Sequence, residues 1–312
     1  MQRVLLRTLV ITALLSNLKA DITDYFKKAE NKLDIHFNQM KNIDFIYTIN
    51  LDRRPEKFAD CERALAPYGI HPYRFSAVNG WELSLEDLNN LGVRFQQGMA
   101  KDLWGTAYLP EGTFEPHHEV MHVNGRTYFC HCMSRGAIGI VLSHLSILQD
   151  AYDSGYETVW IMEDDIEVIQ NPHILSHLID QLDSLVSKKV RWDILFTDQD
   201  TKNQEGQYVP CLGYARRPNY TPSRPERFAL SSFLKQTFKK IGARYGAYSM
   251  IVRRSGMEKL LKHFKTYGIF LPYDMEFYLP DDIVMYAVIN DVVSTQPRAL
   301  SDNGSPNYLQ NK

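Results

Sequence analysis

Residues 158–168 read TVWIMEDDIEV, and the interpretation of the whole chain starts from this stretch. Five apolar or β-branched residues run directly into three adjacent acids, Glu163, Asp164 and Asp165. A short continuous apolar run is typical of a strand that is buried on both faces, whereas unpaired charges are too costly to bury in such a core. The stretch therefore predicts a central strand that delivers its acids to the crevice at the carboxyl ends of the strands, where open α/β sheets bind ligands.

The three acids would not all point in the same direction. Side chains alternate along an extended chain, so Glu163 and Asp165 would point one way and Asp164 the other. Two carboxylates on one side suit a hard divalent cation such as Mg²⁺ or Mn²⁺, which can bridge to phosphate oxygens. A solvated acidic loop after a core strand is the alternative that this stretch, taken alone, leaves open.

The composition is that of an ordinary globular protein with one large domain or two smaller ones. The chain has 312 residues and a formal net charge of −2, and this near-neutral balance argues against a nucleic-acid binder. Four cysteines are too few for a disulfide scaffold at this length. Cys130 and Cys132 flank His131 without the spacing of a zinc knuckle, so we interpret them as partly buried thiols.

Residues 1–20 are interpreted separately from the fold. Arg3 and Arg7 precede an uncharged run that ends at Leu18, which is too short to span a bilayer, since that needs about 20 apolar residues. The segment fits a secretory signal with cleavage near Ala20. The alternative is an amphipathic N-terminal helix, compatible with association with a membrane surface, or a poorly ordered start. With a signal the protein would be secreted, periplasmic or in the secretory pathway, and without one it would be cytoplasmic.

The chain opens with a β-α-β pattern. Residues 43–51, IDFIYTINL, are rich in β-branched and aromatic residues and predict a strand. Pro55 suits the first turn of a helix, which we expect to end before Gly69. Residues 71–78 predict the next strand. This order implies a parallel sheet with a right-handed crossover, so the end of the first strand should lie at the same sheet edge as the acids.

Two arginines lie between the first strand and its helix. Arg53 and Arg54 would lie at the sheet edge to which residues 163–165 are delivered, where they could bind a phosphate or a base. The alternative is a solvated pair at the start of a helix.

The segment His118-Glu119-Val120-Met121-His122 matches the zinc-protease pattern H-E-x-x-H. That chemistry requires a helix, which places both histidines one turn apart on one face. The Asn-Gly pair at 124–125 instead predicts a hairpin. On a strand the two histidines would stand about 13 Å apart, at about 3.3 Å per residue, and could not share one zinc ion. A metalloprotease using His118, Glu119 and His122 is kept only as an alternative.

The rest of the chain continues the alternation of helices and strands. We expect helices over 135–154, 172–186 and 255–266, strands over 192–197 and 244–253, a long loop over 202–240 and an apolar segment over 283–289. The expected organisation is a lead-in helix within 21–42, a single domain over 43–300 and a polar tail over 301–312. The predicted fold class is α/β, with a Rossmann-type, mostly parallel sheet and helices on both faces.

Six motifs in this order resemble glycosyltransferase family 25, which includes bacterial lipooligosaccharide galactosyltransferases and collagen galactosyltransferases. They are Ile49-Asn50-Leu51-Asp52-Arg53-Arg54-Pro55, Phe75-Ser76-Ala77-Val78-Asn79-Gly80, Gly139 with Leu142-Ser143-His144, Glu163-Asp164-Asp165, Gly246-Ala247-Tyr248 and Pro272-Tyr273-Asp274. Each motif is weak alone, but together they extend over most of the chain. The resemblance implies a GT-A-like fold and a galactosyltransferase that uses a UDP-sugar, a divalent metal and inversion at the anomeric carbon.

The resemblance also implies roles for individual residues. The residues that would bind the nucleotide sugar are Asn50, Arg53, Arg54, Asn79, Ser143, His144, Glu163 and Asp164. Asp165, together with Glu163, would bind Mn²⁺ or Mg²⁺. Asp274 and Glu276 would be the candidates for the general base. The acceptor would be a glycan, a lipid-linked saccharide as in lipopolysaccharide biosynthesis, or a protein hydroxyl.

Two departures from the family pattern affect the expected metal site and donor site. Asn79 stands where the family often has Asp, and no histidine follows His263, so a late histidine ligand of the kind that some related enzymes use is absent from this sequence. Water would then complete the metal site, or the metal would bind weakly. Separately, a non-catalytic, carbohydrate-binding relative that keeps the fold is a second alternative.

Overall fold

The computed structural model describes residues 21–30, 32, 40–110, 115–186, 191–203 and 205–296. The expected signal segment over 1–20 and the polar tail over 301–312 lie outside these ranges. Where a lead-in helix is expected within 21–42, the described residues contain one 3-10 turn, η1 (Ile22–Tyr25), which is capped by hydrogen bonds at both ends. Within the described ranges, no helix is long and apolar enough to cross a membrane.

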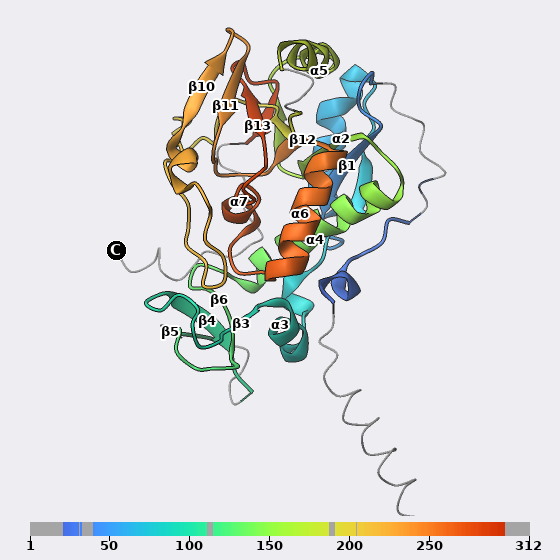
Figure 1. The fold of residues 1–312 in the computed structure, drawn as a ribbon. Helices are drawn as coiled ribbons and strands as arrows, with labels where there is room; N and C mark the ends of the chain where they lie inside the picture. Colours follow the sequence, from blue (N-terminus) through green and yellow to red (C-terminus); the bar gives the residue numbers. More distant parts are fainter. Residues whose placement is uncertain are drawn as a thin grey trace, which may run out of the picture.

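An eight-stranded sheet forms the centre of the molecule (Figure 1), in the order β10-β11-β13-β9-β12-β7-β1-β2. Its strands are β1 (Phe45–Asn50), β2 (Tyr73–Ser76), β7 (Thr158–Glu163), β9 (Ile194–Phe196), β10 (Ser231–Leu234), β11 (Phe238–Ile241), β12 (Ser249–Arg253) and β13 (Met285–Val288). Strand β1 pairs in parallel with both β2 and β7, as the opening β-α-β pattern predicts. Strand β7 is buried at every residue except Glu163, at its carboxyl end.

The sheet is mixed rather than mostly parallel, which corrects the sequence-based expectation. Strand β12 runs antiparallel to both of its neighbours, β7 and β9, and β11 runs antiparallel to β10 and β13. The physical reason lies in the connection from β9 to β12, because parallel neighbours require a crossover, usually helical. Residues 202–248 instead contain a long loop, the 3-10 turn η5 (Pro225–Ala229) and the β10–β11 hairpin.

Helices cover both faces of this sheet (Figure 1). They are α2 (Pro55–Leu65), α4 (Arg135–Asp153), α5 (Ile174–Leu185) and α6 (Arg254–Tyr267). The chain also forms the shorter helices α3 (Leu85–Leu91) and α7 (Tyr273–Glu276) and the 3-10 turns η3 (Ala66–Tyr68) and η4 (Gly80–Glu82). One apolar core joins Tyr47 of β1 to α4 and α6, and a second joins the adjacent Ile46 to α2 and α5. Because side chains alternate along β1, they pack into both cores, one on each face of the sheet.

A smaller sheet lies beside α3, at one end of the molecule (Figure 1). Its strands β3 (Val93–Arg94), β4 (Trp104–Tyr108), β5 (Pro116–Val120) and β6 (Thr127–Cys130) are ordered β3-β6-β4-β5. The Asn-Gly turn at 124–125 joins β5 to β6, but β4 lies between these strands, so they do not form the predicted hairpin. A two-stranded ribbon of β8 (Ile166–Val168) and β14 (Val293–Thr295) continues from β7.

The zinc-protease alternative is wrong because His118 lies on an extended strand. On β5 the His118 Nδ1 atom is 3.0 Å from the hydroxyl of Thr106. His122 follows the end of the strand, where its Nδ1 donates to the Val120 carbonyl at 2.7 Å. The helical turn that would bring both imidazoles to one metal ion is not formed.

Candidate functional site

The carboxyl ends of three parallel strands meet at one edge of the large sheet. Asn50 at the end of β1 is in register with Ser76 of β2, and the neighbouring Ile49 is in register with Glu163 of β7. A pocket with a volume of about 100 Å³ opens at this edge. Its walls come from the ends of β1 and β7, from η4 and from the amino-terminal half of α4. The acids of residues 163–165 therefore lie beside a cavity, in the crevice that the sequence predicts.

Two glycines allow the loop before η4 to lie directly against α4. A Cβ atom at Gly80 would lie 1.8 Å from the Arg135 carbonyl oxygen, and one at Gly139 would lie 2.5 Å from the Val78 carbonyl oxygen. Ser143 holds this loop against α4, since its hydroxyl accepts from the Val78 amide at 2.8 Å and donates to the Gly139 carbonyl at 2.7 Å. The wall of the pocket is thus held by backbone packing.

The change Gly80→Ala should destabilise the protein, because the new methyl group would collide with backbone atoms that cannot move aside as a flexible side chain could. We expect a loss of about 1–3 kcal/mol in the free energy of unfolding, the usual cost of overpacking. Urea unfolding measures it, with Gly213→Ala as the control, because nothing lies within 4 Å of a Cβ atom at Gly213. Equal stabilities for the two variants would contradict this description of the wall.

Asn50 is buried and all of its amide atoms are used within the protein. Its Nδ2 donates to Asp164 Oδ2 at 2.6 Å and to the Arg54 carbonyl at 2.8 Å, and its Oδ1 accepts from Arg74 Nε at 2.7 Å. Arg74 in turn forms an ion pair with Asp52 at 2.9 Å. Asn50 therefore orients Asp164 and the β1–α2 turn, and it does not line the pocket.

Lys57 lines the pocket, whereas the predicted arginines do not. Arg53 is exposed, and Arg54 forms an ion pair with Glu56 at 2.5 Å. The positive charge of Lys57 lowers the pKa values of Glu163 and Asp165, which burial raises. The sequence contained a clue to the role of Lys57. A cation in the first turn of a helix is disfavoured by the helix dipole, so its presence there suggests a nearby negative charge or ligand.

Glu163 and Asp165 both line the pocket in an environment that disfavours their charges. Burial raises the pKa of Glu163 to about 8, and Asp274 and Asp164 add repulsion. Burial, followed by repulsion from Glu163, raises the pKa of Asp165 to about 6. A bound cation would reverse both effects, because an opposite charge nearby favours a carboxylate.

The fit of a divalent ion to this pocket rests on two carboxylates. Asp165 Oδ1 is buried and has no hydrogen-bond partner among the described residues, so one oxygen is left available beside Glu163. No group of three or more His, Cys, Asp or Glu side chains in the described ranges converges to hold a metal ion. Two carboxylates supplemented by substrate phosphates and water are a usual arrangement for Mg²⁺, and the residues fit an ion held in that way.

His144 lies between Glu163 and α7. It is fully buried, its Nε2 is 3.2 Å from Glu163 Oε1, and its ring stacks on Tyr273 with centroids 4.1 Å apart and planes 9° apart. Burial lowers the pKa of His144 to about 3, against a smaller opposing effect of Asp274, so the imidazole is neutral near pH 7. A neutral imidazole in this place orients Glu163 without adding charge.

A second pocket, with a volume of about 170 Å³, adjoins the first and shares Ile140 and Glu163 with it. Asp274 lines this second pocket, and its Oδ2 accepts from the Gly246 amide at 3.2 Å. Burial raises the pKa of Asp274. The structure therefore brings Asp274, from the late motif, to the same cavity as Glu163, from the acidic strand.

Glu276, the other acid predicted on this segment, points into the core. It has no exposed surface, forms an ion pair with the buried Arg217, and accepts from the Leu271 amide at 2.9 Å. It lines neither pocket. Asn79 does line the first pocket, where its Oδ1 accepts from the Trp81 amide at 3.2 Å and caps η4.

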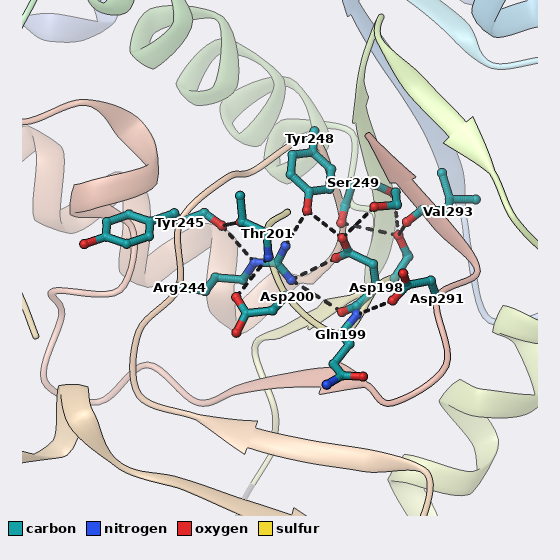
Figure 2. A network of polar contacts seen from close by, with 12 residues as sticks. Asp198, Gln199, Asp200, Thr201, Arg244, Tyr245, Tyr248, Ser249, Asp291 and Val293 are labelled. Atoms are coloured by element: carbon teal, nitrogen blue, oxygen red, sulfur yellow. Dashed lines mark hydrogen bonds and ion pairs between the residues drawn. The ribbon is translucent and has the colours of Figure 1, made fainter. Parts of the chain in front are cut away.

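A buried polar network supports the wall of the second pocket (Figure 2). Asp198, at the end of β9, forms an ion pair with Arg244 at 2.9 Å and accepts from the Tyr248 hydroxyl at 2.5 Å and from Ser294 at 2.9 Å. Arg244 also donates to the Tyr248 hydroxyl at 2.9 Å. The network fixes the segment that runs from Arg244 to Tyr248, which includes the amide that contacts Asp274.

Comparison with known proteins gives one family. A family model described as glycosyltransferase family 25 (LPS biosynthesis protein) matches residues 43–277. A glycosyltransferase 25 family member from Drosophila melanogaster is 34% identical over 46% of this chain and 19% of that protein, and one from Aedes aegypti is 26% identical over 58% and 24%. A human protein named inactive glycosyltransferase 25 family member 3 is 28% identical over 52% of this chain and 23% of that protein. The matched stretch thus spans less than a quarter of the length of these relatives.

Proposed function

The chain belongs to glycosyltransferase family 25, and we propose that it transfers a sugar from a UDP-sugar to a hydroxyl acceptor. One observation carries the proposal: two pockets meet at Glu163, the first bordered by acids and Lys57 and the second by Asp274. A donor in the first pocket and an acceptor in the second would meet at their junction. The mixed sheet with helices on both faces supports a GT-A-like fold. We take galactose as the sugar because the resemblance described in the sequence analysis implies it.

We assign the donor to the first pocket on the basis of its lining. Of the residues expected to bind a nucleotide sugar, those that line it are Asn79, Ser143, His144, Glu163 and Asp164. Lys57 adds a cation for the diphosphate, and the first turn of α2 adds the partial positive charge of a helix amino terminus. Asn50 and the Arg54 carbonyl support this edge from outside the lining, and Arg53 is exposed.

Glu163 and Asp165 would hold Mn²⁺ or Mg²⁺ together with the phosphates of the donor. When bound, such an ion offsets the charge that the departing diphosphate acquires. Lys57 supplies part of the same compensation from the protein itself. Asp165, whose Oδ1 has no partner among the described residues, is the ligand to which the proposal gives most weight.

Asp274 would act as the general base. As the acceptor oxygen forms its bond to the anomeric carbon, the bond from that carbon to the diphosphate breaks, and the proton of the hydroxyl passes to the Asp274 carboxylate. Attack from the second pocket, on the side away from the diphosphate, would invert the anomeric centre. Burial raises the pKa of Asp274, which makes its carboxylate a stronger base. The acceptor would be a glycan, a lipid-linked saccharide or a protein hydroxyl.

UDP release from a panel of UDP-sugars, with Mn²⁺ and with EDTA, tests the proposal. We expect turnover of one donor, with a decrease of about 100-fold or more in EDTA and a similar decrease in Asp165→Asn, since the ion stabilises the leaving charge by several kcal/mol. Asp153→Asn, an exposed acid outside both pockets, is the matched control and should be unchanged. Release that is insensitive to EDTA and to Asp165→Asn would contradict metal assistance.

Lys57→Gln should weaken donor binding. Loss of a charge-assisted contact to phosphate is expected to raise the donor KM about tenfold. Lys41→Gln is the control, because Lys41 is 72% exposed and forms an ion pair only on the surface, with Asp180. An unchanged donor KM in Lys57→Gln would show that the diphosphate lies elsewhere.

A non-catalytic, carbohydrate-binding protein is the second candidate function. The observation that favours it is the name of the human relative, which describes that protein as inactive. Sugar binding by calorimetry, without UDP affinity and without UDP release from any donor, would support this second candidate against the first.

A further inference from the structure

The helix that carries Asp274 is too short to be stable alone. Helix α7 has four residues, Tyr273–Glu276, and one turn of helix fixes several dihedral angles for a single hydrogen bond. Its position must therefore come from the groups that hold it. Asp274 accepts one hydrogen bond, from the Gly246 amide at 3.2 Å, so most of the restraint has to come from the rest of α7.

Glu276 anchors one end of α7 through a buried ion pair. Its partner is Arg217, which belongs to the long loop between β9 and β10 and is 3% exposed. The same guanidinium donates to the carbonyls of Tyr267 at 2.7 Å and Gly268 at 3.1 Å, at the end of α6. Glu276 accepts from the Leu271 amide at 2.9 Å. Arg217 and Glu276 together thus join the end of α6, the segment that follows it, and α7.

The other end of α7 is attached to the pocket junction. Tyr273 stacks on His144, whose Nε2 is 3.2 Å from Glu163 Oε1. The anchor at Glu276 and this stack lie on either side of Asp274 in the sequence. A shift of α7 would therefore move Asp274 relative to Glu163, and a misplacement of about 1 Å in a reacting group can cost about 100-fold in rate.

Stability alone does not account for a buried pair in this place. Removing charges from water costs about as much as their attraction returns, and well-packed apolar residues often serve a core equally well. The contacts of Arg217 are directional and join two segments, the end of α6 and helix α7, which suits a role in geometry.

We propose that Arg217 is a positioning residue, which fixes the distance of Asp274 from the pocket junction through its ion pair with Glu276. The inference rests on the proposed function and deepens it, because it assigns the long loop a part in setting the general base. Arg217 lines neither pocket, so its effect on Asp274 would be transmitted through Glu276 and α7.

A double-mutant cycle tests the inference. The four proteins are wild type, Arg217→Gln, Asp274→Asn and the double variant, with kcat, acceptor KM and donor affinity measured on protein shown to be folded by circular dichroism. Arg216→Gln is the control, because Arg216 is the neighbouring residue but forms only an exposed pair with Asp102 at 3.2 Å.

We expect Arg217→Gln to lower kcat about tenfold or more with donor affinity unchanged, and to have less than about a twofold effect when Asp274 is already asparagine, because residues that act as a unit are not additive. Arg217→Lys, which keeps the charge, should restore part of kcat. If Arg217→Gln does not fold, the same cycle with Arg217→Lys tests whether the loss of kcat depends on Asp274.

An equal fold-loss in both backgrounds, or an unchanged kcat in folded Arg217→Gln, would overturn the inference. A failure of the proposed function gives a different result from a failure of this inference, because the wild-type protein would then release no UDP from any donor. In that case the inference would also be wrong.

Discussion

Asp274→Asn should lower kcat for sugar transfer by about 10²–10⁴-fold, the usual contribution of a positioned general base. Asparagine has nearly the same shape and can still accept from the Gly246 amide, as Asp274 does at 3.2 Å, but it cannot take the proton of an acceptor hydroxyl. UDP affinity should fall little if at all, because Asp274 does not line the first pocket and the loss of its charge only relieves repulsion on Glu163. Steady-state UDP release at saturating donor and acceptor measures the first quantity, and calorimetry measures the second.

The pH dependence of wild type gives an independent check on Asp274. Burial raises its pKa, so the carboxyl stays protonated to a higher pH than a free aspartate, and transfer should fall as the pH is lowered through that raised value. The control variant Asp153→Asn, at an exposed acid, should have the same transfer rate as wild type and the same decrease at low pH. If Asp274→Asn retained transfer within about threefold of wild type, another group would have to be the base.

Asp198→Asn should cost about 3–5 kcal/mol in the free energy of unfolding, because it leaves the guanidinium of Arg244 buried without its counter-charge. Asp198 has no exposed surface, Arg244 is 1% exposed, and the two form an ion pair at 2.9 Å (Figure 2). Asparagine preserves the volume, so the loss reports the charge and its hydrogen bonds rather than a cavity. Equilibrium urea unfolding is the measurement.

The control for this variant is an ion pair of similar length on the surface. Asp60 pairs with Arg63 at 2.7 Å, with side chains 55% and 74% exposed, and such pairs contribute less than about 1 kcal/mol. Asp60→Asn should therefore have almost no effect. A loss below about 1 kcal/mol in Asp198→Asn would show that Arg244 finds other compensation.

The parts of the fold that were predictable follow from patterns with a local physical cause. The apolar run before Glu163 had to be a buried strand, Pro55 had to lie near a helix start, and the β-α-β order had to bring both strand ends to one edge. The structure has all three features. The antiparallel direction of β12 was not predictable, because it depends on the path of the loop after β9 and not on the residues of the strand itself.

The sequence predicted most of the acidic residues of the candidate site, but not the basic residue that lines it. Asp274 and Glu276 are two residues apart in similar sequence surroundings. Contacts with Arg217 and His263, which come from other parts of the chain, hold Glu276 in the core, whereas Asp274 lines the second pocket. Arg53 and Arg54 lie nearer to the strand end than Lys57, yet the turn into α2 directs Lys57 to the pocket. Such choices are made by tertiary contacts that no local pattern contains.

The central claim is that the pocket between β1, β7 and α4 binds a nucleoside diphosphate with the help of a divalent ion at Glu163 and Asp165. Calorimetric titration of UDP into the wild-type chain, with and without Mn²⁺, tests it most directly, because it needs neither the correct sugar nor the acceptor. The expected result is one UDP bound per chain with Mn²⁺, and affinity reduced at least about tenfold without Mn²⁺ and in Asp165→Asn. UDP binding that is absent, or that is equal in all three titrations, would contradict the claim.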